Sequence, residues 1–171
     1  MLVLTLSSLI WRLSALSTVI RRVLSITDTN EGKKLRIGIL GSTNGTSTQT
    51  LLESCGELGA EVGVIITNRS GAGIINKARS HRVPYMFLSA KGLEHADYDR
   101  RILQILSMHE IDIVVLVGYM KIVSPVLVEA YKGRMFNIHP SLLPKFGGKM
   151  DLDVHSEVIN AGEYSTGCTL H

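Results

Sequence analysis

The sequence predicts an α/β domain with a doubly wound, mostly parallel sheet and helices on both faces. Three observations indicate this fold. Short apolar runs without polar alternation are typical of strands that are buried on both sides. These runs alternate with segments of helical character, and Gly-rich or polar turns separate them. The chain of 171 residues is 45% hydrophobic and 19% charged, which favours a globular protein with one sizeable core.

Residues 1–34 differ from the rest and are expected to form an N-terminal leader or targeting segment with a linker. The stretch is apolar and holds no acidic residue before Asp28. Arg12, Arg21 and Arg22 interrupt it, so no charge-free run is long enough to span a bilayer as a helix. The pattern fits an amphipathic organelle-targeting segment, and a non-native extension or a disordered leader remains an alternative. The predicted location is therefore cytoplasmic, or mitochondrial or plastid if the segment acts in transit.

Residues 35–171 form the predicted domain, whose first half reads as two strands and two helices. LRIGIL at 35–40 is a short apolar strand, and the turn GSTNGTS follows it. TQTLLESCGEL at 48–58 has helical character and ends before Gly59. EVGVIIT at 61–67 is the next strand, and GIINKARSH at 73–81 is the next helix.

The middle of the domain continues the alternation. PYMFLS at 84–89 is a strand or an extended run. DYDRRILQILSMH at 97–109 is a helix that places Ile102, Ile105 and Leu106 on one face. DIVVLVGY at 112–119 is the most apolar strand of the chain.

The last part contains two helices and two strands. SPVLVEAY at 124–131 is a helix with Ser124 as its N-cap and Pro125 at its first position. RMFNIH at 134–139 is a strand, and LDVHSEVINAG at 152–162 is a helix that Gly162 ends. TGCTLH at 166–171 begins another strand.

The fold class locates the chemistry before any motif is considered. Ligands of open parallel sheets bind at the carboxyl ends of the strands, where the strand order reverses. The segments expected at this edge are 41–47, 68–71, 118–123 and 137–141.

GSTNGTSTQ joins the first strand to the first helix and is a candidate phosphate site. Small residues allow a tight turn, and free amides at a helix N-terminus attract an anion. Thr46, Ser47 and Thr48 add hydroxyl donors. The stretch is neither a Walker loop nor GxGxxG, and a turn without a ligand is the plain alternative.

VGYMKIVSP leaves the most buried strand and carries Met120, Ile122 and Val123 toward the ligand edge. These apolar side chains could line a flat ligand, because Met adapts to irregular surfaces. The alternative is that they cap the core beneath the following helix.

NIHPSLLP holds the strongest chemical signal. Asn137 and His139 lie two apart in a strand, so their side chains point to the same face. His moves protons near neutral pH, and Asn donates a hydrogen bond to a developing oxyanion without titrating. The pair suits the attack of an amine on a carbonyl, although a single strand His more often has a structural role.

Composition and missing motifs exclude several functions. After residue 34 the chain holds 13 basic and 13 acidic residues, so no broad basic face for nucleic acid is expected. Two cysteines, Cys55 and Cys168, are too few for a disulfide framework or a zinc site and are expected to be reduced thiols. Gly-x-Ser-x-Gly and His-Glu-x-x-His are absent, which argues against serine hydrolases and zinc proteases.

Four stretches, GILGSTNGTSTQTLL, VIITNRSGAG, GYMKIVSP and FNIHPSLLPKF, resemble the phosphoribosylglycinamide formyltransferases in order and spacing. These are folate-dependent enzymes of purine synthesis with a Rossmann-like fold, and the resemblance covers Leu35 to His171. It implies transfer of a formyl group from 10-formyltetrahydrofolate to the amine of phosphoribosylglycinamide, without a metal. Nucleic acid and a stable membrane span are not implied, and the oligomeric state stays open.

The resemblance also assigns residues. His139 matches the catalytic proton donor, and Asn137 matches the residue that steadies the formyl oxygen and contacts the folate. The segment that holds the substrate phosphate matches Gly45, Thr46, Ser47 and Thr48. The folate-binding set matches His95, Met120, Lys121, Ile122 and Val123, with Lys and His standing where Arg is common in the family.

Two departures from the family pattern lead to further expectations. GGKMDLDVH at 147–155 is a few residues longer than the common form. The family's catalytic Asp follows the strand GCTLH by several residues, so the chain is expected to be a C-terminally incomplete, N-terminal two-thirds of the domain. The alternatives are a formyltetrahydrofolate deformylase, another member of the formyltransferase family, or an inactive binding fragment.

Overall fold

The computed structural model describes residues 2–4, 33–139, 143–145, 152–162 and 168–171. The strands in these ranges are β1 (Leu2–Leu4), β2 (Leu35–Gly41), β3 (Ala60–Thr67), β4 (Tyr85–Phe87), β5 (Ile113–Val117), β6 (Met135–His139) and β7 (Cys168–Leu170). The helices are α2 (Thr46–Ser54), the 3-10 turn η1 (Gly56–Leu58), α3 (Ile74–Ser80), α4 (His95–Met108), α5 (Pro125–Ala130) and α6 (Leu152–Asn160).

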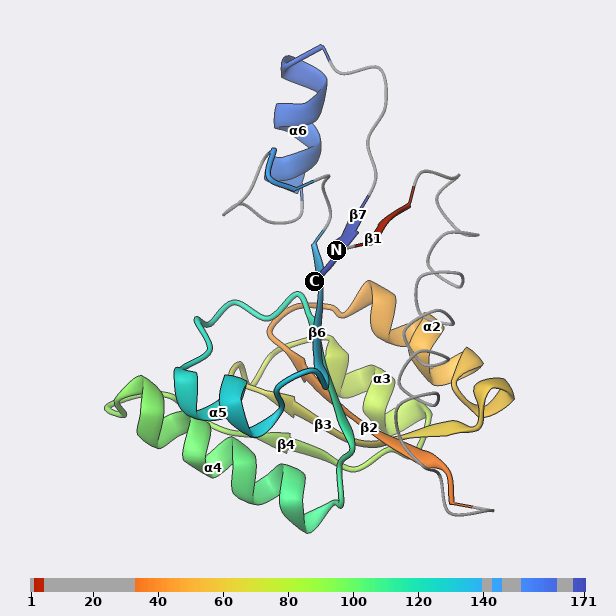
Figure 1. The fold of residues 1–171 in the computed structure, drawn as a ribbon, viewed down its shortest axis with the longest axis vertical. Coiled ribbons are helices and arrows are strands. Elements are labelled where there is room, and N and C mark those ends of the chain that lie inside the picture. Colours follow the sequence, from red (N-terminus) through yellow and green to blue (C-terminus); the bar gives the residue numbers. More distant parts are fainter. Residues whose placement is uncertain (1, 5–32, 140–142, 146–151, 163–167) are drawn as a thin grey trace.

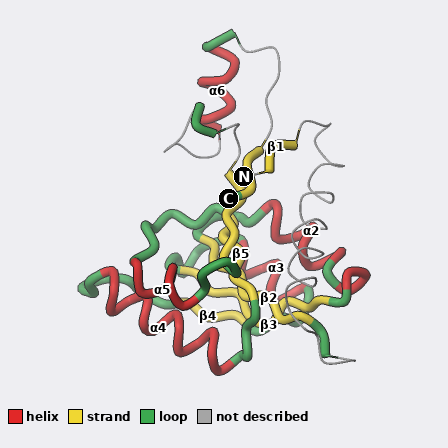
Figure 2. Tube along the Cα trace, viewed as in Figure 1, coloured by secondary structure: helices red, strands yellow, loops and turns green. Residues whose placement is uncertain are grey.

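The strands form one sheet in the order β1-β7-β6-β5-β2-β3-β4 (Figures 1 and 2). The five strands from β6 to β4 are parallel. β7 returns antiparallel beside β6, and β1 pairs antiparallel with β7. The predicted doubly wound, mostly parallel sheet is therefore confirmed. From β2 the chain adds β3 and β4 on one side, and it then crosses to add β5 and β6 on the other side, so the strand order reverses between β2 and β5.

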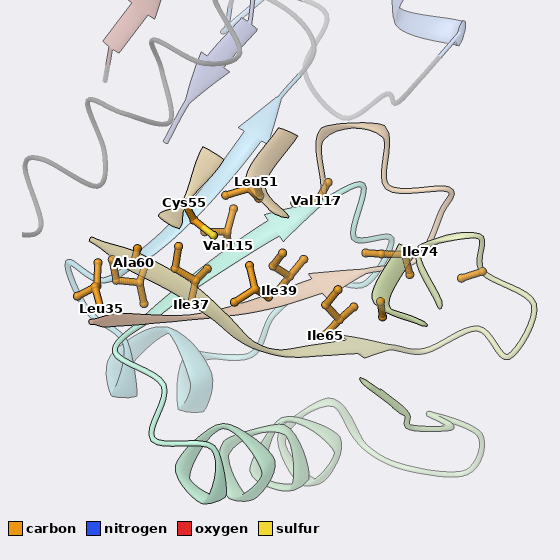
Figure 3. Packing of buried hydrophobic residues seen from close by; sticks show 14 residues of the cluster. Leu35, Ile37, Ile39, Leu51, Cys55, Ala60, Ile65, Ile74, Val115 and Val117 are labelled. Atoms are coloured by element: carbon orange, nitrogen blue, oxygen red, sulfur yellow. The ribbon is translucent and has the colours of Figure 1, made fainter. Parts of the chain in front are cut away.

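Helices α2 and α3 cover one face of the sheet. Leu51 of α2 and Ile74 of α3 pack with Ile37, Ile39 and Val115 in one buried cluster (Figure 3). Each fully buried side chain of this size contributes about 1.5–3 kcal/mol relative to exposure. The apolar runs of the sequence are thus explained by burial on this face and on the opposite one.

Helices α4 and α5 cover the opposite face. Ile102 and Leu106 of α4 and Leu127 of α5 pack against Leu40 and Val114. The two apolar positions of α4 lie four residues apart, as the helical period of the sequence predicts.

A register shift between β2 and β3 decides which β3 side chains face which helices. Ile37 pairs with Val62, but Gly38 pairs with Val64, so Gly63 is an extra residue in β3. After this bulge Val64 and Ile66 face α4, while Ile65 faces α2 and α3. A bulge changes the side-chain parity that a strand otherwise keeps.

The predicted elements appear with boundaries shifted by at most two residues, and two details differ. Ser124 occupies the N-cap position of α5 and Pro125 begins the helix, but the Ser124 side chain makes no capping hydrogen bond. The predicted helix 48–58 is split into α2 and the turn η1.

Most of the expected leader, residues 5–32, lies outside the described residues, as do residues 146–151, which include the first part of the longer segment at 147–155. Leu2–Leu4 is described and forms the strand β1. None of the helices in the described ranges combines the length and apolar character that crossing a bilayer requires.

Candidate active site

The carboxyl ends of the parallel strands bring the expected ligand segments to one edge. The order β6-β5-β2-β3 places the ends of these four strands side by side. The segments that begin there are 41–47, 68–71 and 118–123, together with the described residues 137–139. Residues 140–142 of the last predicted segment are outside the described residues.

Asn137 and His139 lie at the carboxyl end of β6, and a second histidine joins them. The Asn137 Nδ2 atom lies 2.9 Å from Nε2 of His171. The ring centroids of His139 and His171 are 6.5 Å apart, and the rings are tilted by 52°. His139 is only 9% exposed, whereas His171 is exposed. The predicted pair is thus a group of three side chains, and one of them faces solvent.

Backbone pairing explains how His171 reaches this place. The Asn137 N–H donates to the His171 carbonyl at 2.7 Å, and the His171 N–H donates to the Asn137 carbonyl at 3.1 Å. The nitrogen of a carboxamide only donates, so in this orientation Nε2 of His171 accepts and the ring proton lies on Nδ1. Asn137 keeps a second N–H for another acceptor.

His171 was not among the residues that the sequence singled out as functional. Its partner Asn137 precedes it by 34 positions, and the contact depends on the antiparallel return of β7. The available signal was a histidine at the end of a strand-like run, which also describes many structural histidines. Only the strand order, which places His171 beside Asn137, distinguishes it from a structural histidine.

The expected phosphate segment begins helix α2. Gly45 is its N-cap, Thr46 is exposed, and Ser47 is half-buried. Thr48 is fully buried, and its Oγ1 has no hydrogen-bond partner among the described residues. The Thr48 N–H donates to the Gly45 carbonyl at 2.9 Å. Solvent therefore reaches Thr46 and part of Ser47, while the Thr48 hydroxyl is turned inward.

The segment after β5 is fastened to the segment after β2. The Ser42 N–H donates to the Gly118 carbonyl at 3.1 Å, and the Met120 N–H donates to Ser42 Oγ at 2.8 Å. Gly118 has φ +55°, and a Cβ there would lie 2.5 Å from Thr43 Oγ1. Only glycine fits this close approach, which brings the two candidate ligand segments together.

The four predicted folate-contacting residues after Tyr119 divide between surface and core. Met120 is 38% exposed and Ile122 is 78% exposed, so both are available to a ligand. Val123 packs against the buried cluster that includes Leu127 of α5, as the core-capping alternative expects. Lys121 places Nζ 5.0 Å from the centroid of the Tyr98 ring.

Helix α4 supports this segment through a buried carboxylate. Asp99 is 1% exposed, and its Oδ2 accepts the Ser124 N–H at 2.6 Å. The sequence carried a signal for this role, because Asp99 shares the buried face of α4 with Ile102, and a buried carboxylate needs a partner. His95 is exposed at the start of α4, one helical turn before Asp99, and thus on the same side of the helix.

Metal ligands do not cluster in the described part of the chain. No group of three or more His, Cys, Asp or Glu side chains there could hold an ion. The described part of the site consists of hydroxyl and amide groups, two histidines and a loop in which Lys121 stands among apolar residues.

A comparison with known families defines the class of protein. The formyl transferase family matches residues 35–171, and the chain belongs to that family. The names of its relatives point to a narrower group within the family. The chain is 34% identical over 139 residues to phosphoribosylglycinamide formyltransferase of Haemophilus influenzae, covering 80% of this chain and 64% of the relative. It is 35% identical over 144 residues to human trifunctional purine biosynthetic protein adenosine-3, covering 82% of this chain and 14% of the relative.

A solved structure gives the same result. The crystal structure of glycinamide ribonucleotide transformylase 1 from Geobacillus kaustophilus superposes with a TM-score of 0.74 at 36% identity. The match covers 81% of this chain and 73% of that one. The chain thus spans about two-thirds of the single-function relative and a much smaller part of the trifunctional one.

Proposed function

We propose that this protein transfers the formyl group of 10-formyltetrahydrofolate to the primary amine of phosphoribosylglycinamide, a step of purine synthesis. The observation that carries the proposal is the group formed by His139, Asn137 and His171 at the carboxyl edge of the sheet. The names of the relatives support the same reaction.

The reaction needs an oxyanion to be stabilised and protons to be moved. The amine nitrogen attacks the formyl carbon, and a new N–C bond forms as the carbonyl electrons move to oxygen. The free N–H of Asn137 and a proton on His139 stabilise this oxyanion. The carbonyl then re-forms, the bond between carbon and folate N10 breaks, N10 gains a proton, and the product nitrogen loses one.

His171 has a positioning role in this scheme. By accepting one Asn137 N–H at 2.9 Å, it fixes the amide so that the second N–H has a defined direction. A preorganised donor stabilises a transition state better than a rotating one, because no reorganisation is needed during the reaction.

The two substrates are assigned to different segments of the site. The phosphate is assigned to the start of α2, at Gly45 to Ser47, where Thr46 is exposed and Ser47 is half-buried. The folate is assigned to the exposed side chains of Met120 and Ile122, with Lys121 beside them and His95 toward its tail. The buried Thr48 then acts by shaping the turn.

The test is turnover of a His139→Ala variant, measured by the absorbance change of the folate when the ribotide is added. Loss of one oxyanion donor costs about 2.7–4 kcal/mol of barrier, so kcat should fall by about 10²–10³-fold. His109→Ala is the matched control, because His109 ends α4 at the opposite edge of the sheet. Near-normal turnover of His139→Ala would sink the proposal.

Two further outcomes would replace the proposed reaction with another one. Formyl loss from the folate in the absence of the ribotide would make water the acceptor and the protein a deformylase. Binding of both ligands by the purified protein with no product would make it a binding protein.

A further inference from the structure

A cavity lies at the same edge of the sheet as His139 but on the other side of β2. It holds about 500 Å³ and opens between the segments that follow β2 and β3, with Phe87 of β4 as its outer wall. The strand order puts β5 and β6, with His139, on the opposite side of β2. Two strand spacings, about 10 Å, therefore separate β6 from β2, and the cavity lies beyond β2.

The lining of this cavity suits an organic anion. It contains one cation, Arg69, and no acidic residue. Arg69 is exposed and makes no ion pair with the described residues. The carboxamides of Asn44 and Asn68 and the hydroxyl of Ser70 add neutral hydrogen-bonding groups. Phe87 is 45% exposed and offers an aromatic face.

One wall of the cavity is held in a fixed orientation. The Ser42 hydroxyl donates to Asn68 Oδ1 at 2.6 Å, and Ser42 Oγ accepts the Met120 N–H at 2.8 Å. Ser42 is 2% exposed, so this chain of hydrogen bonds is shielded from water. The amide nitrogen of Asn68 is consequently oriented before any ligand arrives, and ordering it on binding costs little.

The position of Arg69 narrows the ligand class. In doubly wound sheets that bind nucleotides, phosphate lies near the turn after the first strand, and the end of the second strand recognises the ribose. An Arg near that second position accommodates a 2′-phosphate of the ribose, so a cation there can pair with a phosphate on the sugar. Here β2 and β3 are the first and second strands of the parallel sheet, and Asn68, Arg69 and Ser70 directly follow β3.

We propose that this cavity binds a nucleoside monophosphate, separately from the substrates of the formyl transfer. Arg69 and Ser70 hold the phosphate, the two carboxamides hold the ribose hydroxyls, and the base stacks on Phe87. A volume of about 500 Å³ falls within the range of small-molecule sites. The proposal goes beyond the proposed function, since it requires no formyl transfer.

Adenosine 5′-monophosphate (AMP) is the probe, titrated into the purified protein in low-salt buffer by isothermal calorimetry. AMP is expected to bind, and Arg69→Gln should weaken it about tenfold, because a charge-assisted phosphate contact is lost. Arg79→Gln is the matched control: Arg79 lies on α3 beside Tyr85 and does not line the cavity. Far-UV circular dichroism checks that both variants fold.

A second pair of titrations separates the cavity from the substrate phosphate segment. Phe87→Leu should weaken AMP severalfold and leave ribose 5-phosphate unchanged, because only AMP carries a base. The proposal is overturned if AMP does not bind at millimolar concentration, or if Arg69→Gln and Arg79→Gln bind it equally. It is also overturned if ribose 5-phosphate matches AMP in every variant, because the base would then make no contact with Phe87.

These titrations are independent of catalysis. An inactive protein that binds AMP through Arg69 would leave this proposal standing and remove the proposed function. A protein that transfers the formyl group but does not bind AMP would support the proposed function and overturn this proposal.

Discussion

Replacing Gly118 by alanine tests whether the close approach of the two ligand segments is required. Gly118 follows β5 with φ +55°, and an added Cβ would lie 2.5 Å from Thr43 Oγ1. The substitution therefore introduces backbone strain and a steric clash. Gly59 is a natural comparison, because it has φ +70° but no atom within 4 Å of its Cβ position.

The two contributions have different magnitudes. A left-handed conformation costs a non-glycine residue about 1–2 kcal/mol. Overpacking of a filled site adds about 1–3 kcal/mol. Gly59→Ala should therefore lower the free energy of unfolding by about 1–2 kcal/mol, and Gly118→Ala by about 2–5 kcal/mol.

A double variant isolates the clash. Thr43→Ala removes the crowding Oγ1 and leaves the Thr43 Cβ at 3.6 Å, an ordinary contact distance. In the Gly118→Ala background it should restore about 1–3 kcal/mol, while the strain remains.

Urea unfolding followed by far-UV circular dichroism measures all four proteins. The slope of the unfolding free energy against urea should stay unchanged, which shows that the midpoints report stability. Equal losses for Gly59→Ala and Gly118→Ala, or no recovery on adding Thr43→Ala, would refute the reasoning.

Three further predictions rest on buried groups. Asp99→Ala leaves the Ser124 N–H buried without an acceptor and should cost about 1–3 kcal/mol of unfolding free energy, with Asp99→Asn losing less; equal stability of wild type and Asp99→Ala in urea contradicts this. Leu51→Ala empties a site that is 1% exposed and should cost about 2–5 kcal/mol in the same assay; a loss below about 1 kcal/mol would show that the site collapses or is not packed as described. Burial raises the pKa of Tyr119 far above its ordinary value near 10, so the folded protein keeps this proton when the unfolded chain begins to lose it. Its effect on the free energy of unfolding is therefore absent below about pH 10 and lowers stability as the pH rises above it. Tyr119→Phe should flatten that fall, and an unchanged slope between pH 9 and 11 would contradict the assignment.

Much of the fold could be predicted because its signals are local. Each strand of the parallel sheet is a short apolar run, and each helix carries apolar residues at helical spacing, as Ile102 and Leu106 do. Strands that alternate with helices then predict an α/β fold with a parallel sheet, and the doubly wound form is one of its two common arrangements. The edge that carries Asn137 and His139 follows from the same rule, since ligands bind at the carboxyl ends of such strands.

Other parts of the site were not predictable, because they depend on contacts between residues far apart in the chain. His171 meets Asn137 only because β7 returns antiparallel beside β6. Ser42 joins Asn68 and Met120, which lie 26 and 78 positions away, through strands that become neighbours in the sheet. No periodicity in the sequence specifies which strands are adjacent.

The sequence by itself determined the order of the elements, the edge of the sheet that holds the site and the Asn-His pair, because burial and strand period act within a few residues. The tertiary structure decided the third member of that group, the bulge at Gly63 and the cavity beside Arg69. These features depend on strand order and register, which form only when distant segments pack together.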